Sequence, residues 1–186
     1  MKKILFALLL VSYLGFSQNS NTSYEMIENS ESQYKIDLKK SIVKNIDFTN
    51  IGPSVMSGRV TDLEVNPKNT TEFYVAYASG GLWHTVNNGT TFNPIMDNSI
   101  TPNSGDFDVD WNYRIIYVGT GESNSSRSSY PGIGILKSTD NGKTWTNVGL
   151  RDSHHVSRIM INPENSDHVV VAIIGHLYSE NEERGI

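Results

Sequence analysis

The chain has 186 residues, a formal net charge of −5 and no cysteine. Its length suits one globular domain, and a mildly acidic chain with no basic run longer than two residues argues against nucleic-acid binding. The lack of cysteine excludes disulfides, thiolate chemistry and cysteine-based zinc sites.

Residues 1–17 have the pattern of a secretory signal peptide. Two lysines follow the first methionine, residues 4–14 are almost entirely apolar, and Gly15 and Ser17 provide small residues for cleavage. The apolar run is too short to span a bilayer comfortably, and the alternative is a buried core helix. We expect export to the periplasm, the cell surface or the medium, with no membrane span in the mature chain.

Residues 18–47 are polar and lack a strong period, so we interpret them as a flexible leader with room for a short helix. Within and just beyond it, residues 34–48 alternate weakly between apolar and polar side chains. That stretch is interpreted as a strand or a docking segment.

From residue 48 onward the sequence reads as strands. Short runs rich in Val, Ile, Tyr and Phe alternate with turn clusters of Gly, Asn, Asp, Ser and Pro. The strand-like runs are "RVTDLEV", "EFYVAYAS", "RIIYVGT", "GILKST", "SRIMI" and "HVVVAIIG". No segment after residue 50 carries a helical period, so we predict an all-β fold.

The strands recur with a period of roughly 50 residues. "GLWHTVNNGTTF" (residues 81–92) aligns with "GILKSTDNGKTW" (residues 134–145), and the first strands align at Val65, Val109 and Ile161. Several short strands in a unit of this length are typical of a propeller blade.

We therefore predict a partial β-propeller of about two and a half four-stranded antiparallel blades. The repeat units cover about 48–98, 99–150 and 151–186. Because propellers close with roughly four to eight blades, we expect the remaining blades from further C-terminal sequence. The alternative is a ring completed by other copies of the chain.

A hairpin motif, Ser-x-Asp-x-Gly-x-Thr-Trp, ends the third strand of each complete unit. Its oxygens can accept unpaired backbone N–H groups, its glycine permits a positive φ, and its aromatic ring can pack under the turn. An amide replaces the acid in the first copy, which a turn cap tolerates and a catalytic carboxylate does not, so we interpret both copies as structural. Their residues are Thr85, Asn87, Gly89 and Phe92 in the first copy, and Ser138, Asp140, Gly142 and Trp145 in the second.

This motif is the Asp-box, which recurs in the BNR repeats of sialidases, in the sortilin propeller and in two-propeller xyloglucan hydrolases. Together with "NIGPSVMSGRVTDLEVNP" and "YVAYASGGLWHTVNNGTTF", it makes residues 48–186 resemble the start of large exported BNR or sortilin-N-terminal-type propeller proteins of Bacteroidetes. These proteins are often labelled glycosyl hydrolases. The resemblance is specific for architecture and weak for activity, because propellers host many functions.

The resemblance does not supply a catalytic set. A sialidase needs three arginines together, and nothing in the sequence brings three of the arginines of this chain into one place. In the xyloglucan hydrolases a catalytic Asp precedes the "GG" before the first box, and that position is Ala78 here. The catalytic residues are therefore unknown, and a secreted glycoside hydrolase would need carboxylates largely outside this chain.

Loops on one propeller face are the candidate site. We expect them to form a polar funnel that binds a glycan or a protein partner, the alternative being solvated loops. We expect neither cofactor nor metal, since neighbouring residues of a strand point to opposite faces and the two adjacent histidines could not share an ion. The candidate ligand-binding residues are Arg59, Glu122, Arg127, Tyr130, His154 and His155.

Overall fold

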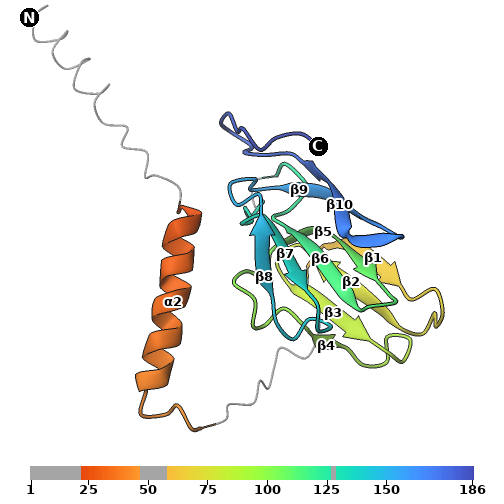
Figure 1. The fold of residues 1–186 in the computed structure, drawn as a ribbon, viewed down its shortest axis with the longest axis horizontal. Helices are drawn as coiled ribbons and strands as arrows, with labels where there is room; N and C mark the ends of the chain where they lie inside the picture. Colours follow the sequence, from red (N-terminus) through yellow and green to blue (C-terminus); the bar gives the residue numbers. More distant parts are fainter. Residues whose placement is uncertain (1–21, 47–57, 127–128) are drawn as a thin grey trace, which may run out of the picture.

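The computed structural model describes residues 22–46, 58–126 and 129–186, so the predicted signal peptide lies outside the described residues. Two four-stranded antiparallel sheets and one two-stranded antiparallel sheet follow one another along the chain (Figure 1). The predicted all-β fold, a partial propeller, is confirmed. The strands of the first sheet are β1 (Val60–Val65), β2 (Phe73–Tyr77), β3 (Gly81–Thr85) and β4 (Asn93–Pro94). The second contains β5 (Ser104–Asp110), β6 (Ile115–Thr120), β7 (Ile135–Ser138) and β8 (Thr146–Gly149), and the third β9 (Val156–Asn162) and β10 (Asn165–Ile173).

The middle sheet is buried on both faces, which explains the continuous apolar run of β6. Successive side chains of a strand point to opposite faces. Ile116 and Val118 therefore pack in the core shared with the first sheet, while Tyr117 packs with Val156 and Ile159 of the third sheet. The three sheets are thus consecutive layers, each pressed against the next.

Side chains of β5 also form hydrogen bonds that link the second sheet to the third. The carboxylate oxygens of Asp106 and Asp108 accept hydrogen bonds from the backbone N–H groups of Ile159 and Ile161, both at 2.6 Å. These acids satisfy backbone donors along one edge of β9, which has β10 as its partner on the other edge. The first strands of the three sheets therefore lie side by side.

Because the strands of each sheet are antiparallel, the loops that join them lie at two opposite ends of the sheets. At one end β1, β5 and β9 begin, as the pairs Val60–Tyr77, Ser104–Thr120 and Val156–Ile173 show. We call it the cavity end, because the cavities described below lie there. At the opposite end, the hairpin end, lie the turns that join β3 to β4 and β7 to β8, which carry the two motif copies.

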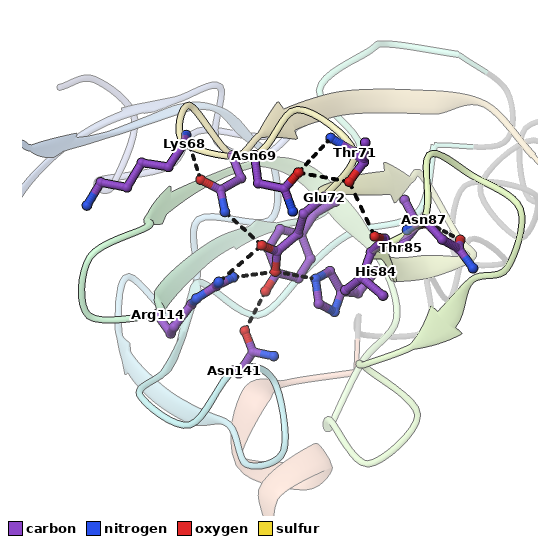
Figure 2. A network of polar contacts seen from close by, with 12 residues as sticks. Lys68, Asn69, Thr71, Glu72, His84, Thr85, Asn87, Arg114 and Asn141 are labelled. Atoms are coloured by element: carbon purple, nitrogen blue, oxygen red, sulfur yellow. Dashed lines mark hydrogen bonds and ion pairs between the residues drawn. The ribbon is translucent and has the colours of Figure 1, made fainter.

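A polar network at the hairpin end links the first two sheets. Figure 2 shows Glu72 between Arg114 and His84. Arg114 donates to both carboxylate oxygens of the buried Glu72, at 2.5 and 3.1 Å, and the Tyr74 hydroxyl donates to Asn141 Oδ1 at 2.5 Å. The hydrogen bonds from the Arg114 guanidinium lower the pKa of Glu72 to about 2. Because every oxygen of Glu72 has a protein partner, the network is a structural link between sheets.

The polar leader contains a helix, α2, over Tyr24–Lys40, which is longer than the short helix for which the prediction left room. Of the two interpretations of residues 34–48, a strand or a docking segment, the strand is wrong as far as Lys40. Ser23 caps the helix by accepting the N–H of Met26 at 3.3 Å, and the last turn contains two lysines, which suit the negative end of the helix dipole. Among residues 22–46, 58–126 and 129–186, no helix is long and apolar enough to cross a membrane.

Candidate functional site

A cavity of about 890 Å³ opens at the cavity end of the sheets. The β4–β5, β6–β7 and β8–β9 loops, the segment after β10 and the first turn of α2 all contribute to its wall. A second cavity of about 400 Å³ lies at the same end, beside Gly80 and Met96. The larger volume is within the range of sites that bind small molecules.

The wall of the larger cavity mixes aromatic, aliphatic and charged groups. Ile100 and Ile133 supply apolar surface, and Tyr24 lies beneath the Arg151 guanidinium at 4.5 Å. Tyr178 stands at the rim with 86% of its surface exposed. Asp152, His154, His155 and His176 complete the polar part of the wall.

Glu122 organises several of the predicted site residues without facing solvent itself. Its side chain is 1% exposed, and Arg59 Nη2 donates to its Oε2 atom. Its backbone N–H donates to the Tyr130 carbonyl at 3.1 Å, and its carbonyl lies 2.7 Å from His155 Nδ1. The structure thus brings Arg59, Glu122, Tyr130 and His155 together, but it places Glu122 behind the wall as an anchor for its neighbours.

His155 is buried, with 3% of its surface exposed, and this burial lowers its pKa below 6.5, which favours the neutral ring. The neutral ring can carry its proton on Nδ1 and donate it to the Glu122 carbonyl. Its contact with Glu122 therefore couples the β6–β7 loop to the start of β9.

His154 faces a different set of partners. It precedes β9, in a loop, and has φ of 54°. The His154 and His155 rings meet edge to face, with centroids 6.3 Å apart. The His154 ring stacks on His176, with centroids 3.7 Å apart. Burial, and then the neighbouring His176, lower the pKa of His154. Asp152 Oδ1 lies 3.8 Å from His154 Nε2 and 3.2 Å from His176 Nε2.

Two glycines of the β6–β7 loop, Gly121 and Gly132, pack closely against this wall. A Cβ atom on Gly121 would lie 1.8 Å from the His154 carbonyl oxygen, and Gly121 has φ of +83°. The Gly132 N–H donates to that same carbonyl at 2.6 Å. Tyr130 is half-exposed, whereas Arg127 lies outside the described residues.

The two hairpin motifs lie at the opposite end and use their oxygens inside the turn. Ser138 Oγ accepts the N–H of Gly142 at 2.9 Å, and Asp140 Oδ1 accepts that of Thr144 at 2.9 Å. In the first copy, Thr85 Oγ1 accepts from Gly89 at 3.0 Å and Asn87 Oδ1 from Thr91 at 2.9 Å. Trp145 Nε1 donates to the Ile95 carbonyl at 2.9 Å, which ties the second hairpin to the first sheet. Amide and acid thus occupy equivalent positions with equal geometry.

A set of carboxyls lies between β1 and β5, of which Asp106 is buried and Glu64 is partly exposed. Burial, with the charge of Asp108, raises the pKa of Glu64 to about 7. Burial raises the pKa of Asp106 to about 6, against the hydrogen bond from the Ile159 backbone. Such shifts are found at active sites, but Asp106 and Asp108 also accept hydrogen bonds from β9, which gives them a structural role.

No sequence pattern identifies Asp152, His176 or Tyr178 as part of the wall. Asp152 lies two residues before His154, and no motif marks it. His176 and Tyr178 follow β10, and no repeat or motif marks that segment. Only the folded chain brings it back over the β8–β9 loop.

Comparison with known proteins gives limited results. No family model matches the sequence, and no curated protein matches it. The crystal structure of an ancestral GH74 enzyme is similar, with 16% identity, a TM-score of 0.48 and coverage of 63% of this chain and 16% of that one. The GH74 enzyme of Niastella koreensis is similar with 24% identity, a TM-score of 0.46 and coverage of 60% and 16%. The chain therefore covers 16% of each of these structures, and the likeness carries no conclusion about activity.

Proposed function

We propose that this chain belongs to an exported β-propeller of the BNR or sortilin-N-terminal type that binds a glycan or a protein partner through its cavity end. The observation that carries the proposal is the cavity of about 890 Å³, with its wall of aromatic and charged side chains. Export rests on the signal-peptide pattern of residues 1–17.

A glycan is the ligand that the wall suits best. Tyrosine rings offer apolar faces with a polar tip, which match the alternating C–H and hydroxyl surface of a sugar. Tyr178 is exposed at the rim, and Tyr24 is held in place by the Arg151 guanidinium above it. Asp152 and the imidazoles add hydrogen-bonding groups beside these rings.

We also propose that further blades pack on the outer sheets. Leu63 of β1 is 48% exposed, and Met160 of β9 and Val170 of β10 are 56% and 50% exposed. Apolar side chains on a sheet face ordinarily pack against another layer. These faces fit a ring in which the described sheets are consecutive blades.

Glycoside hydrolysis is the second candidate, and the raised pKa of Glu64 favours it. A carboxyl that keeps its proton near neutral pH can act as a general acid. Glu64 lies in β1, apart from the residues that line the cavity, and its neighbours Asp106 and Asp108 accept backbone hydrogen bonds. Binding is therefore the better supported function.

Screening the exported protein on a glycan array, followed by product analysis of every bound glycan, tests both functions. Binding without cleavage is the expected result. Cleavage that is lost in Glu64→Gln would favour the hydrolase. If no glycan binds and a panel of peptides from exported proteins does, the ligand is a protein.

A further inference from the structure

Two histidines and one aspartate converge at the wall of the larger cavity. The ligand atoms of Asp152, His154 and His176 all lie within 4.8 Å of one another. Asp152 and His154 come from the β8–β9 loop and His176 from the segment after β10. Two parts of the chain more than 20 residues apart therefore supply one compact donor set.

The separations suit a tetrahedral metal ion. Zinc binds imidazole nitrogen and carboxylate oxygen at about 2.0–2.2 Å, which places neighbouring ligand atoms of a tetrahedron about 3.4 Å apart. The distances from Asp152 Oδ1 to His176 Nε2 and His154 Nε2, 3.2 and 3.8 Å, bracket that value. Both Nε2 atoms thus lie around one carboxylate oxygen, Asp152 Oδ1. Because the ring planes are only 27° from parallel, the rings must rotate apart for both in-plane lone pairs to reach one ion.

Neighbouring groups orient two of these ligands. Ser179 Oγ lies 2.8 Å from His176 Nδ1, so the hydroxyl can accept the Nδ1 proton and leave the Nε2 lone pair for a metal ion. Nε2 also lies 3.0 Å from the Asp152 carbonyl oxygen, a contact that the ion would replace. Asn181 Nδ2 donates to Asp152 Oδ2 at 3.2 Å and to its carbonyl at 3.0 Å, which leaves Oδ1 available. Partners of this kind fix the tautomer and direction of metal ligands.

We propose that Asp152, His154 and His176 bind one divalent transition-metal ion of the zinc class. Imidazole and carboxylate donors favour zinc and its neighbours over calcium and magnesium, which prefer six or more oxygen ligands. Since all three residues line the cavity, the fourth position of the ion faces the cavity and can take water or a ligand oxygen. The site shares its three residues with the proposed glycan-binding wall, but the evidence for it is the donor geometry alone, and its test uses no glycan.

The test is a titration of the chelator-treated exported protein, produced without a histidine tag, with Zn²⁺ by calorimetry and with Co²⁺ by visible absorption. Asp152→Asn is the first variant, because this side chain is 67% exposed and its loss leaves the core intact. His176→Gln is the second variant. His168→Gln is the matched control, because this exposed histidine lies in β10, apart from the three ligands.

We expect one Zn²⁺ per chain and a tetrahedral Co²⁺ spectrum, with no binding of Ca²⁺ or Mg²⁺. Both ligand variants should weaken Zn²⁺ binding at least 100-fold, and Asn181→Ala should weaken it about tenfold. The control should bind as the unmodified chain does. No Zn²⁺ binding, or equal loss in the control, would overturn the proposal, as would unchanged affinity in Asp152→Asn at an unchanged melting temperature.

Discussion

Exchanging acid and amide between the two hairpin motifs tests whether the motif residues act only within the turn. Asp140 in the second copy and Asn87 in the first accept equivalent hydrogen bonds, with side-chain oxygens 2.9 Å from the N–H groups of Thr144 and Thr91. The bond to the threonine hydroxyl is reversed between the copies: Asn87 Nδ2 donates to Thr91 Oγ1 at 2.9 Å, whereas the Thr144 hydroxyl donates to Asp140 Oδ2. Asp140→Asn can therefore reproduce the geometry already present in the first copy.

The magnitude follows from the bonds that each substitution removes. A hydrogen bond to a charged group contributes about 1.5–3 kcal/mol and a neutral one about 1 kcal/mol. Asp140→Asn keeps the bond from the Thr144 N–H, reverses the bond with the Thr144 hydroxyl as in the first copy, and loses the charge, so it should cost about 1 kcal/mol. Asp140→Ala removes the acceptor of both the Thr144 N–H and its hydroxyl, which lies 2.6 Å from Oδ2. It should cost about 2 kcal/mol, or about 4–8 °C in melting temperature.

Urea and thermal unfolding of the exported protein at neutral pH measure these costs, with Asn87→Asp as the reciprocal variant. We expect Asn87→Asp to be neutral or slightly stabilising, and all three variants to bind ligand unchanged. If Asp140→Asn costs as much as Asp140→Ala, the charge rather than the hydrogen-bond geometry stabilises the turn. If Asp140→Ala leaves stability unchanged but abolishes binding, the motif is a functional site and our interpretation fails.

Three further predictions concern buried groups. Because the Arg114 guanidinium holds the pKa of Glu72 at about 2, the carboxylate stabilises the fold above pH 4.5 and that stabilisation is lost as the pH falls from 4.5 towards 2. Glu72→Gln should therefore lose about 2–3 kcal/mol at pH 7 and much less near pH 2 in urea titrations. Burial raises the pKa of Glu64 from 4.5 to about 7, so the free energy of unfolding should decline as the pH rises through this interval. Glu64→Gln should flatten that decline, and an unchanged dependence on pH in this variant would refute the raised pKa. Gly121→Ala should destabilise by more than about 2 kcal/mol, because its Cβ would meet the His154 carbonyl, whereas Gly149→Ala, at φ of +132° with open space around it, should show only backbone strain of about 1 kcal/mol. Equal melting temperatures of these two variants would contradict the close packing of the β6–β7 loop.

Local patterns in the sequence predicted the strands and hairpins because their causes are local. The alternation in "RVTDLEV" and the apolar run of "RIIYVGT" correspond to β1 and β6, and the repeated motif identified equivalent turns. Period-two burial and turn chemistry depend on residues a few positions apart. These features can therefore be predicted without knowledge of the tertiary structure.

The extent of the helix and the composition of the cavity wall could not be predicted from local patterns. The leader has room for a short helix, but none of the residues of α2 is fully buried, and its cap at Ser23 is a single residue in a polar stretch, so its length is not indicated. His176 reaches His154 only because the segment after β10 returns over the β8–β9 loop. Glu122, which we expected in an open funnel, is buried by the same loop packing. Long-range contacts decide each of these placements.

The most direct test of the account is the affinity of the exported protein for its best array ligand, measured with Tyr178→Ala and Tyr113→Ala. Both tyrosines are exposed, but Tyr178 stands at the cavity rim and Tyr113 in the β5–β6 turn of the hairpin end. Tyr178→Ala should weaken binding about tenfold, which is the loss of about 1.4 kcal/mol of aromatic contact, at an unchanged melting temperature. Tyr113→Ala should leave the affinity unchanged. Equal affinities of the two variants, or a loss confined to Tyr113→Ala, would contradict binding at the cavity end.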